Sequence, residues 1–557
     1  MKTAIKLRIF FLLSFFSSLL LFSQNTAETY GKLFEERSDI SAQIQAKLEE
    51  LSTDPGFRIS GEKYHNIEYV TNLYQKNNYH PFWTDLSYAE DAINGIRQSY
   101  EDGLTPLDYH LEAILHLENE IIRNAEIDEE MLETAADLEL LLTDGVILYA
   151  DHLLYGKCDP VTLLSTWNFG FAPIPDLNPS TFRQYIQNGE VTSRLQKLRP
   201  DIFLYDTLLS SLAFYREIET EGGWQEITAG GKIEPGDQDE RIPQIRHRLE
   251  LSDAITVKDT ARSTIYDQNL EQDIRRFQRT HGLDADGVIG AGTFRELNKP
   301  VDERIETIRV NLERVRWVAG NLPQSYLIVN IAAYWLVLVK DGRIIHKANV
   351  VVGKPLNKTP VFRDKIRYID FNPNWTVPTS IIKNEIIPKL KKNPKYLEDN
   401  HMVLLDNQGN EVSSSVLDIE NLSASKFPYI VRQQPGPWNA LGVVKFMFPN
   451  DYDIYLHDTP SKSLFSKASR AYSHGCIRVQ NPLDLAEVLL AGTEWDRAKI
   501  NKVIDSRELT RVKLTEPLDI MLSYWTCGLN PDREFFFSSD PYDRDKDLLR
   551  ELDKNLH

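Results

Sequence analysis

Cys476, His474 and His457 are the residues whose types and spacing best suit chemistry in this sequence. Cys476 lies in the run Ser473-His474-Gly475-Cys476-Ile477-Arg478, and fifteen residues separate His457 from Ser473. A thiol reacts as its thiolate, and an imidazole within hydrogen-bond reach can take its proton. Gly475 permits a tight turn that would leave the neighbouring backbone amides free to hold a developing oxyanion. Together these residues indicate covalent acyl transfer through a thioester.

Two other interpretations of the same residues stay open at this point. Cysteine is among the residues most often buried, and a lone histidine can be a core residue, so the set could be structural. Two histidines and one cysteine could also bind zinc. The His-x-Cys spacing matches structural zinc sites poorly, however, and no fourth ligand is evident, so we expect no metal.

The sequence around these residues predicts a β-rich domain over residues 301–545. His457 ends an apolar, strand-like run that starts at Tyr452, and Cys476 lies between a polar loop and the element that begins at Ile477. From about residue 325 the apolar residues alternate, as is typical of strands, and Asp341-Gly342 is typical of a hairpin turn. The expected strands are 326–331, 334–340, 343–352, 368–370, 443–448, 454–457 and 517–524.

A less β-like insertion over about 376–436 interrupts this domain. It is rich in Asn, Lys and Pro, and Ile381 to Lys391 has a helical pattern. A long insertion between core strands often forms a lid over an active site, where it would exclude water. Trp375 and Trp438 lie near its two ends, where they could line the substrate site or pack in the core.

The chain before residue 300 is predicted to be mostly helical. A polar lead-in (24–60), either a helix or a flexible segment, precedes a helical scaffold domain (61–235). Within this domain, Ala135 to Tyr155 is apolar on most faces and should be a buried central helix. A glycine-rich linker leads to a compact three-helix unit at 240–298. Its Gly290 and Gly292 have the wrong spacing for a nucleotide-binding loop. Residues 546–557 are expected to be a polar tail.

The N-terminus predicts export. Lys2, Lys6 and Arg8 precede an apolar run from Ile9 to Phe22, and polar residues follow. This order is typical of a signal peptide, here 1–23. The alternative is an uncleaved anchor that would hold the N-terminus at the inner membrane, although the run is shorter than the roughly 20 residues that a span needs. We therefore expect a periplasmic or cell-envelope protein.

Composition excludes some classes of protein. The 557 residues suggest roughly three domains, and the net charge of −19 argues against nucleic acid as a partner. Three cysteines are too few for a disulfide scaffold. Cys158 and Cys527 could pair and leave Cys476 free, but sequence does not give their separation.

Two parts of the chain resemble known families. The pattern of His457, fifteen residues and Ser-His-Gly-Cys resembles the signature of the L,D-transpeptidases, whose catalytic module is the YkuD-type domain. The flanking runs 372–378, 436–442 and 455–460 agree with it. Phe277-Gln278, Gly282-Leu283 and Asp286 to Thr293 resemble the three-helix peptidoglycan-binding module. The resemblance implies a multidomain α+β protein, the large form of this family, with a helical scaffold domain and a lidded mixed-sheet catalytic domain.

The resemblance also implies residue roles. Cys476 is the nucleophile, and His457 is the general base, oriented by a carbonyl at its neighbour Asp458. His474 shapes the oxyanion hole with the amides of Gly475 and Cys476. Arg478 orders the loop or binds a substrate carboxylate. Further substrate contacts are expected from Ser473, Asp458, Tyr455, Trp375 and Asn439.

The implied reaction joins two peptidoglycan stem peptides. Cys476 attacks the third residue of a tetrapeptide donor, D-Ala leaves, and the amine of a neighbouring stem resolves the thioester into a 3→3 cross-link. No cofactor is required, and carbapenem-type β-lactams are expected to acylate the thiol. The alternatives are an L,D-carboxypeptidase that uses water, transfer to a D-amino acid or a wall protein, and a non-catalytic protein that only binds the wall.

Overall fold

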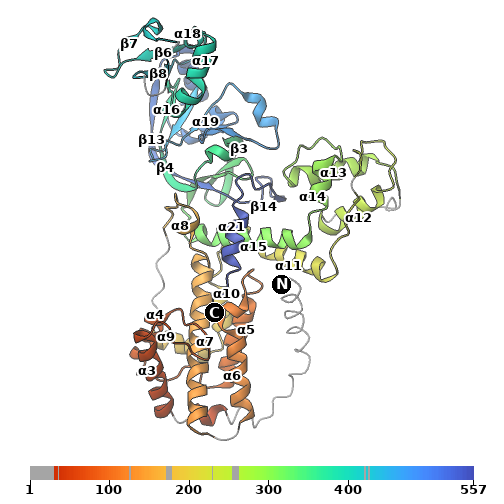
Figure 1. Ribbon diagram of the computed structural model, residues 1–557, viewed down its shortest axis with the longest axis vertical. Coiled ribbons are helices and arrows are strands. Elements are labelled where there is room, and N and C mark those ends of the chain that lie inside the picture. The colour runs from red at the N-terminus through yellow and green to blue at the C-terminus, as the bar shows by residue number, and fades with distance from the viewer. Residues whose placement is uncertain are drawn as a thin grey trace.

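The computed structural model describes residues 30–34, 37–124, 127–170, 178–228, 230–253, 263–320, 322–419, 422–423 and 427–556. The signal peptide expected at 1–23 lies outside these residues. Within them, no helix is both long and apolar enough to cross a membrane. Figure 1 shows an elongated molecule with a helical domain at one end, a β-rich domain with its insertion at the other, and a small helical unit at the side.

The helical domain is built around α7 (Glu129–Tyr155). Asp128 caps its first turn by accepting a hydrogen bond from the Met131 amide, and Gly156, with φ of 87°, follows its end. Leu138, Leu141 and Leu142 are fully buried, which confirms the predicted buried central helix. The other helices are α3 (Arg37–Thr53), α4 (Ile67–Lys76), α5 (Leu86–Gln98), η2 (Pro106–Tyr109), α6 (Leu111–Arg123), α8 (Pro160–Leu163), α9 (Pro179–Gln187), α10 (Val191–Gln196) and α11 (Phe203–Thr220).

Two segments expected to be polar appendages contain packed helices. α3 lies within the lead-in and buries Ile40, Ile44 and Leu48. The tail expected at 546–557 begins inside α21 (Asp545–Leu552), which buries Leu548 and Leu552. In both helices the apolar residues recur every four positions, so a narrow stripe is buried although most residues are polar.

The three-helix unit consists of α12 (Ile242–Asp253), α13 (Gln268–Thr280) and α14 (Ala291–Leu297) around its own core. The Gln278 side chain organises its glycine turn, because it accepts from the Gly287 amide and donates to Asp286 and to the Val288 carbonyl. α15 (Val301–Ala319) then leads into the β-rich domain. The unit contacts that domain directly, where the Asp284 carboxylate accepts from the Ala468 amide at 2.8 Å.

A nine-stranded mixed sheet forms the β-rich domain, in the order β11-β3-β12-β10-β9-β4-β13-β1-β2. The hairpin predicted at Asp341-Gly342 is present, and both residues have positive φ. The strands are β1 (Ser325–Asn330), β2 (Trp335–Lys340), β3 (Arg343–Gly353), β4 (Phe362–Phe371), β9 (Val444–Met447), β10 (Leu456–His457), β11 (Ala471–Ser473), β12 (Ile477–Val479) and β13 (Thr510–Ser523).

The insertion forms a second sheet with a core of its own, in the order β5-β8-β6-β7. Its strands are β5 (Trp375–Thr376), β6 (Met402–Leu405), β7 (Glu411–Val412) and β8 (Ile430–Gln433), and its helical segments are α16 (Thr379–Ile381), η4 (Ile382–Ile386), α17 (Ile387–Lys392), α18 (Tyr396–Asp399) and η5 (Ser414–Val416). η4 is a π-helical turn. Pro388, just after it, cannot donate to the preceding turn.

The multidomain α+β fold predicted from the sequence is confirmed, with local differences. β10 is shorter than the run from Tyr452 suggested, and β13 is longer than 517–524 because it continues through a register irregularity between Lys513 and Leu518, where Pro517 lacks an amide. The remaining elements are η3 (Pro355–Asn357), η7 (Lys462–Ser466), α19 (Pro482–Leu489), α20 (Arg497–Ser506), β14 (Cys527–Leu529) and β15 (Phe535–Phe537).

Candidate active site

The register of three short strands brings the candidate site residues onto one face of the large sheet. His457 of β10 pairs with Arg478 of β12 on one side and with Lys445 of β9 on the other. The intervening residues Leu456 and Ile477 pair with each other and are fully buried. Because side chains alternate along a strand, the polar residues share the opposite face.

Cys476 immediately precedes β12, two residues before Arg478, and so belongs to the same face. The Ile477 amide donates to the Tyr455 carbonyl at 3.1 Å, which sets Cys476 opposite Tyr455. Tyr455 and His457 are two residues apart on β10, and their rings meet edge-on with centroids 5.6 Å apart. Cys476 and His457 are thus diagonal neighbours on adjacent strands.

The hydrogen bonding of His457 fixes which nitrogen can act as a base. Its Nδ1 lies 2.5 Å from the backbone carbonyl oxygen of Asp458. A carbonyl only accepts, so Nδ1 carries the proton and Nε2 of the neutral ring is free to accept one. Burial, with help from the nearby Arg478 and Lys445 charges, lowers the pKa of His457 to about 3. The imidazole is therefore neutral at physiological pH.

Asp458 holds this arrangement together through its side chain as well. Its carboxylate accepts from the Val443 amide at 3.1 Å and from the Lys462 ammonium. Gly442 lies so close to it that a β-carbon there would overlap the carboxylate, and its φ is +60°. Asp458 is 5 % exposed, so the structure gives it a positioning role where a substrate contact was expected.

Cys476 itself is partly exposed, and its Sγ lies 3.4 Å from the Asp453 carbonyl oxygen. Burial raises the pKa of the Cys476 thiol, while hydrogen bonds from Tyr455 and the charge of Lys445 act in the opposite direction. A raised pKa favours the protonated thiol, so a reaction at Cys476 would need a base to take its proton.

The turn before Cys476 is shaped by Ser473 and Gly475. Ser473 Oγ donates to the Cys476 carbonyl at 2.6 Å and accepts from the Gly475 amide at 3.1 Å. The φ of Gly475 is +125°, a conformation that side chains disfavour. The Gly475 amide, expected to face an oxyanion, is therefore occupied here, and the buried Ser473 orders the turn rather than facing a substrate.

Thr359 links the same turn to the end of β3 by hydrogen bonds. Its hydroxyl donates to the Gly475 carbonyl at 2.7 Å and accepts from the Gly353 amide at 2.9 Å. Thr359 is fully buried, and the sequence analysis did not single it out. A threonine next to a proline carries no sequence signal for this role.

His474 connects the turn to the insertion. Its Nε2 lies 2.7 Å from a carboxylate oxygen of Glu385 in η4, and both side chains are more than one-third exposed. The exposed ring does not fold back into the turn. The insertion thus reaches the residue two before Cys476.

Three other expected substrate contacts occupy different places. Asn439 is fully buried, and its amide donates to the Pro373 and Gln434 carbonyls, so it fixes the base of the insertion. Trp375 packs partly buried against the insertion's core. Arg478 is partly exposed on the functional face, and its Nε is a buried donor without a partner among the described residues. Of the three, only Arg478 is poised for a ligand.

Lys445 also belongs to this face, and the sequence analysis missed it. It alternates with the fully buried Val444 and Phe446 in β9, and its Nζ lies 3.7 Å from the centroid of the Tyr455 ring. The available signal was a lysine between two apolar residues of a predicted strand, which places a charge on the face opposite the core.

The described residues contain no group of three His, Cys, Asp or Glu side chains arranged to hold a metal ion. Cys158 and Cys527 are free, buried thiols. Burial raises the pKa of both thiols strongly, so neither is a competing nucleophile.

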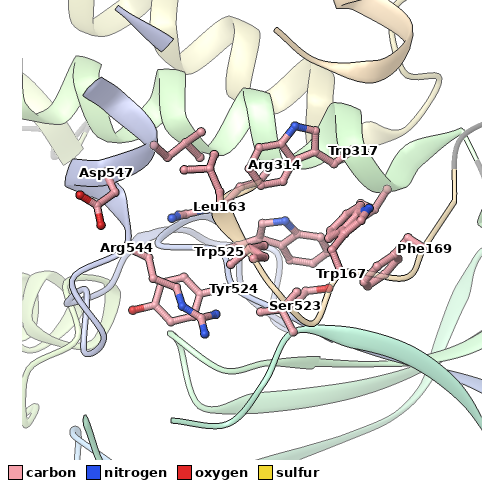
Figure 2. Close-up of a pocket in the computed structure, with 14 residues that line it drawn as sticks. Leu163, Trp167, Phe169, Arg314, Trp317, Ser523, Tyr524, Trp525, Arg544 and Asp547 are labelled. Carbon is pink, nitrogen blue, oxygen red and sulfur yellow. The ribbon is translucent and has the colours of Figure 1, made fainter. Parts of the chain in front are cut away.

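A small pocket, open to solvent, is lined by none of these residues (Figure 2). It is where α15, α21 and the α8 segment meet the end of β13. Trp167 stacks on Phe169 there with ring centroids 4.3 Å apart, and meets Trp317 edge-on. The pocket marks the seam between the helical and β-rich domains, and no cysteine lines it.

Three segments of the chain match known families. Residues 324–504 match the L,D-transpeptidase catalytic domain, YkuD, residues 68–212 match a scaffold domain, and residues 239–297 match a family described as "Putative peptidoglycan binding domain". These matches cover the large sheet except β13, with its insertion, most of the helical domain, and the three-helix unit.

A protein of Haemophilus influenzae described as "Putative L,D-transpeptidase" is 36% identical over 224 residues, which are 40% of this chain and 45% of that protein. The chain thus spans less than half the length of this curated relative. An L,D-transpeptidase structure (residues 123–326) from Xylanimonas cellulosilytica is 15% identical, covering 53% of this chain and 98% of that one, with a TM-score of 0.15. The Ldtfm-avibactam carbamoyl enzyme is 10% identical, covering 37% and 51%, with a TM-score of 0.18. TM-scores this low establish no relationship by themselves.

Proposed function

This chain carries the catalytic domain of the YkuD L,D-transpeptidase family beside a peptidoglycan-binding domain, and on that premise we propose that it forms 3→3 cross-links between stem peptides through a Cys476 thioester. The observation that carries the proposal is the tautomer of His457. Its Nδ1 donates to the Asp458 carbonyl, which leaves Nε2 as a proton acceptor on the same face as the thiol.

The first half-reaction acylates the thiol. Nε2 of His457 takes the Cys476 proton as Sγ forms a bond to the carbonyl carbon of the third stem residue. The bond from that carbon to the nitrogen of D-Ala breaks, and the leaving amine receives the proton from His457. The product is a thioester, with D-Ala released.

The second half-reaction transfers the acyl group. The side-chain amine of another stem's third residue attacks the thioester carbonyl and gives a proton to His457. The bond to sulfur breaks, and Cys476 regains the proton. Arg478 is suited to bind a donor carboxylate, because it is a partly exposed cation on the same face as the thiol.

Water in place of the amine would make the protein an L,D-carboxypeptidase. The favoured outcome depends on the lid, which is joined to the nucleophile's turn by the Glu385–His474 pair. A lid that excludes water protects the thioester until an amine arrives. This contact is our reason for favouring transpeptidation over hydrolysis.

We further propose that the protein works in the cell envelope and that carbapenem-type β-lactams acylate Cys476. The basic, apolar and polar order of residues 1–26 supports export. Acylation follows from the proposed thioester chemistry, since a strained lactam carbonyl is an alternative electrophile.

The test is incubation with purified tetrapeptide muropeptides and mass spectrometry of the products. Cross-linked dimers that have lost one D-Ala are expected. Tripeptide monomers alone would replace the proposal by the carboxypeptidase, and an unchanged substrate would leave only a wall-binding role.

A further inference from the structure

Lys445 occupies a central position in a row of charged side chains on the functional face. The row crosses neighbouring strands in register: Arg511 of β13, Asp370 of β4, Lys445 of β9 and His457 of β10. Residues in register share a face of the sheet. Lys445 therefore stands between a carboxylate on one side and the proposed base on the other.

The carboxylate in this row is already neutralised from its far side. Arg511 holds Asp370 with two hydrogen bonds, of 2.7 and 2.9 Å. No ion pair of Lys445 with a carboxylate is present in the described part of the chain. The positive charge of Lys445 is thus not cancelled by a direct partner.

The ammonium of Lys445 is instead held over an aromatic ring. Its Nζ lies 3.7 Å from the centroid of Tyr455, a favourable cation–π distance. Tyr455 lies opposite Cys476 on the next strand, because the Ile477 amide donates a hydrogen bond to the Tyr455 carbonyl. The ring thus fixes the cation one side chain away from the thiol.

The charges of the other groups around the thiol decide which group can act as counter-charge to a thiolate. His457 is neutral, because burial lowers its pKa to about 3, so no imidazolium is present to pair with a thiolate. Asp453, in the turn before β10, acts against ionisation of the thiol. Two cations face the thiol: Lys445, which lowers the pKa of Cys476, and Arg478, whose charge also interacts with Cys476. Of the two, Lys445 has the larger effect on the pKa of Cys476.

We propose that the ammonium of Lys445 is the fixed counter-charge of the Cys476 thiolate and sets the pH range in which this thiol ionises. Lys445 is then a positioning residue, which acts through Cys476 without contacting the scissile bond. The idea rests on Cys476 being the nucleophile of the proposed function, but it concerns ionisation and not the choice of acceptor.

The test is the pH dependence of alkylation at Cys476 by iodoacetamide, in which the thiolate sulfur forms a bond to carbon and iodide leaves. Lys445→Met should move the midpoint of the rate profile upward by about 1 pH unit or more, as loss of a nearby opposite charge does. Lys445→Arg keeps the charge and should restore a profile close to that of the unmodified protein. Peptide-level mass spectrometry separates Cys476 from the two buried cysteines.

Lys499→Met is the matched control. Lys499 also lies over an aromatic ring, 4.5 Å from the centroid of Trp495, but on α20 and away from the thiol. In Lys499→Met, the pH midpoint of Cys476 alkylation should stay where it is in the unmodified protein. Should Lys445→Met fail to fold, Lys445→Gln removes the charge while keeping a polar side chain. A midpoint that stays in place in a folded, uncharged variant would overturn the proposal, whether or not the protein forms cross-links.

Discussion

Nδ1 of His457 donates a hydrogen bond to the backbone carbonyl of Asp458 over 2.5 Å, and this bond leaves Nε2 as the ring nitrogen that can accept a proton. The partner is a backbone atom, so no side-chain substitution at residue 458 removes it directly. The ring is thus oriented by the course of the chain after β10, while burial keeps it neutral.

A substitution that preserves this bond isolates the role of the second nitrogen. His457→Asn retains a donor near the Nδ1 position but has no group at Nε2. We expect cross-link formation to fall by about 10²- to 10⁴-fold, the usual effect of removing a general base. Initial rates of dimer formation measure the loss. Activity close to that of the unmodified protein would mean that another group takes the thiol proton.

The three cysteines should differ sharply in reactivity. Cys476 is partly exposed, whereas Cys158 and Cys527 are buried and burial raises their pKa strongly. At pH 8, brief iodoacetamide treatment should modify Cys476 alone. Cys158→Ser and Cys527→Ser should leave both labelling and activity in place, as peptide mapping can verify. Equal labelling of Cys158 would show that the two domains open at their seam.

The contact between Glu385 and His474 should restrain the lid. Both side chains are more than one-third exposed, so the pair contributes at most about 1 kcal/mol. Glu385→Gln should therefore raise the ratio of hydrolysed to cross-linked product by only about two- to five-fold, and hydrogen exchange over 379–392 should quicken. Glu398→Gln, whose carboxylate binds Ser414 within the lid, is the control. An unchanged ratio would separate the lid from the choice of acceptor.

The helical domain should lose stability as the pH rises. His110 lies between Asp144 at 2.9 Å and Glu62 at 3.1 Å, and these partners raise its pKa to about 9. A raised pKa means that the stabilisation is complete below the unfolded value of about 6.5 and is lost as the pH rises through 9. Burial also raises the pKa of Glu139 to about 7, so its ionisation destabilises the fold in the same direction.

Thermal unfolding between pH 6 and 10 checks this expectation. The His110 contribution is roughly 3 kcal/mol from the size of its shift. His110→Gln should flatten the pH dependence, whereas His116→Gln, at a largely exposed histidine, should leave it as it was. A stability that rises with pH would contradict the assignment.

Much of the fold follows from periodicity in the sequence. The buried α7 and the hairpin at Asp341-Gly342 are local patterns, which short-range rules describe well. α3 was one of two interpretations of the polar lead-in, and α21 was missed, because a narrow apolar stripe among many charges gives little signal until its partner surface is known. Which strands become neighbours is a tertiary property, so the order of the large sheet was not predictable.

In the candidate site, too, some residues could be identified from the sequence and others only from the fold. Cys476 and His457 stand out by residue type and spacing, but the pairing of β10 with β9 and β12 is what adds Lys445 to the same face. Asn439 and Ser473 belong to sequence runs that resemble the L,D-transpeptidase signature, yet their side chains donate hydrogen bonds to backbone carbonyls. A motif residue can hold the backbone in shape as readily as it can contact a substrate, and the hydrogen bonds of the structure distinguish the two roles.

The most direct test of the account is to trap the acyl-enzyme. The protein is mixed with a tetrapeptide donor in the absence of acceptor, quenched in acid, and its intact mass is measured. The account predicts a mass increase equal to the donor minus D-Ala, located on the peptide that contains Cys476, and no increase in Cys476→Ala. An adduct on any other residue, or one that persists in Cys476→Ala, would contradict it.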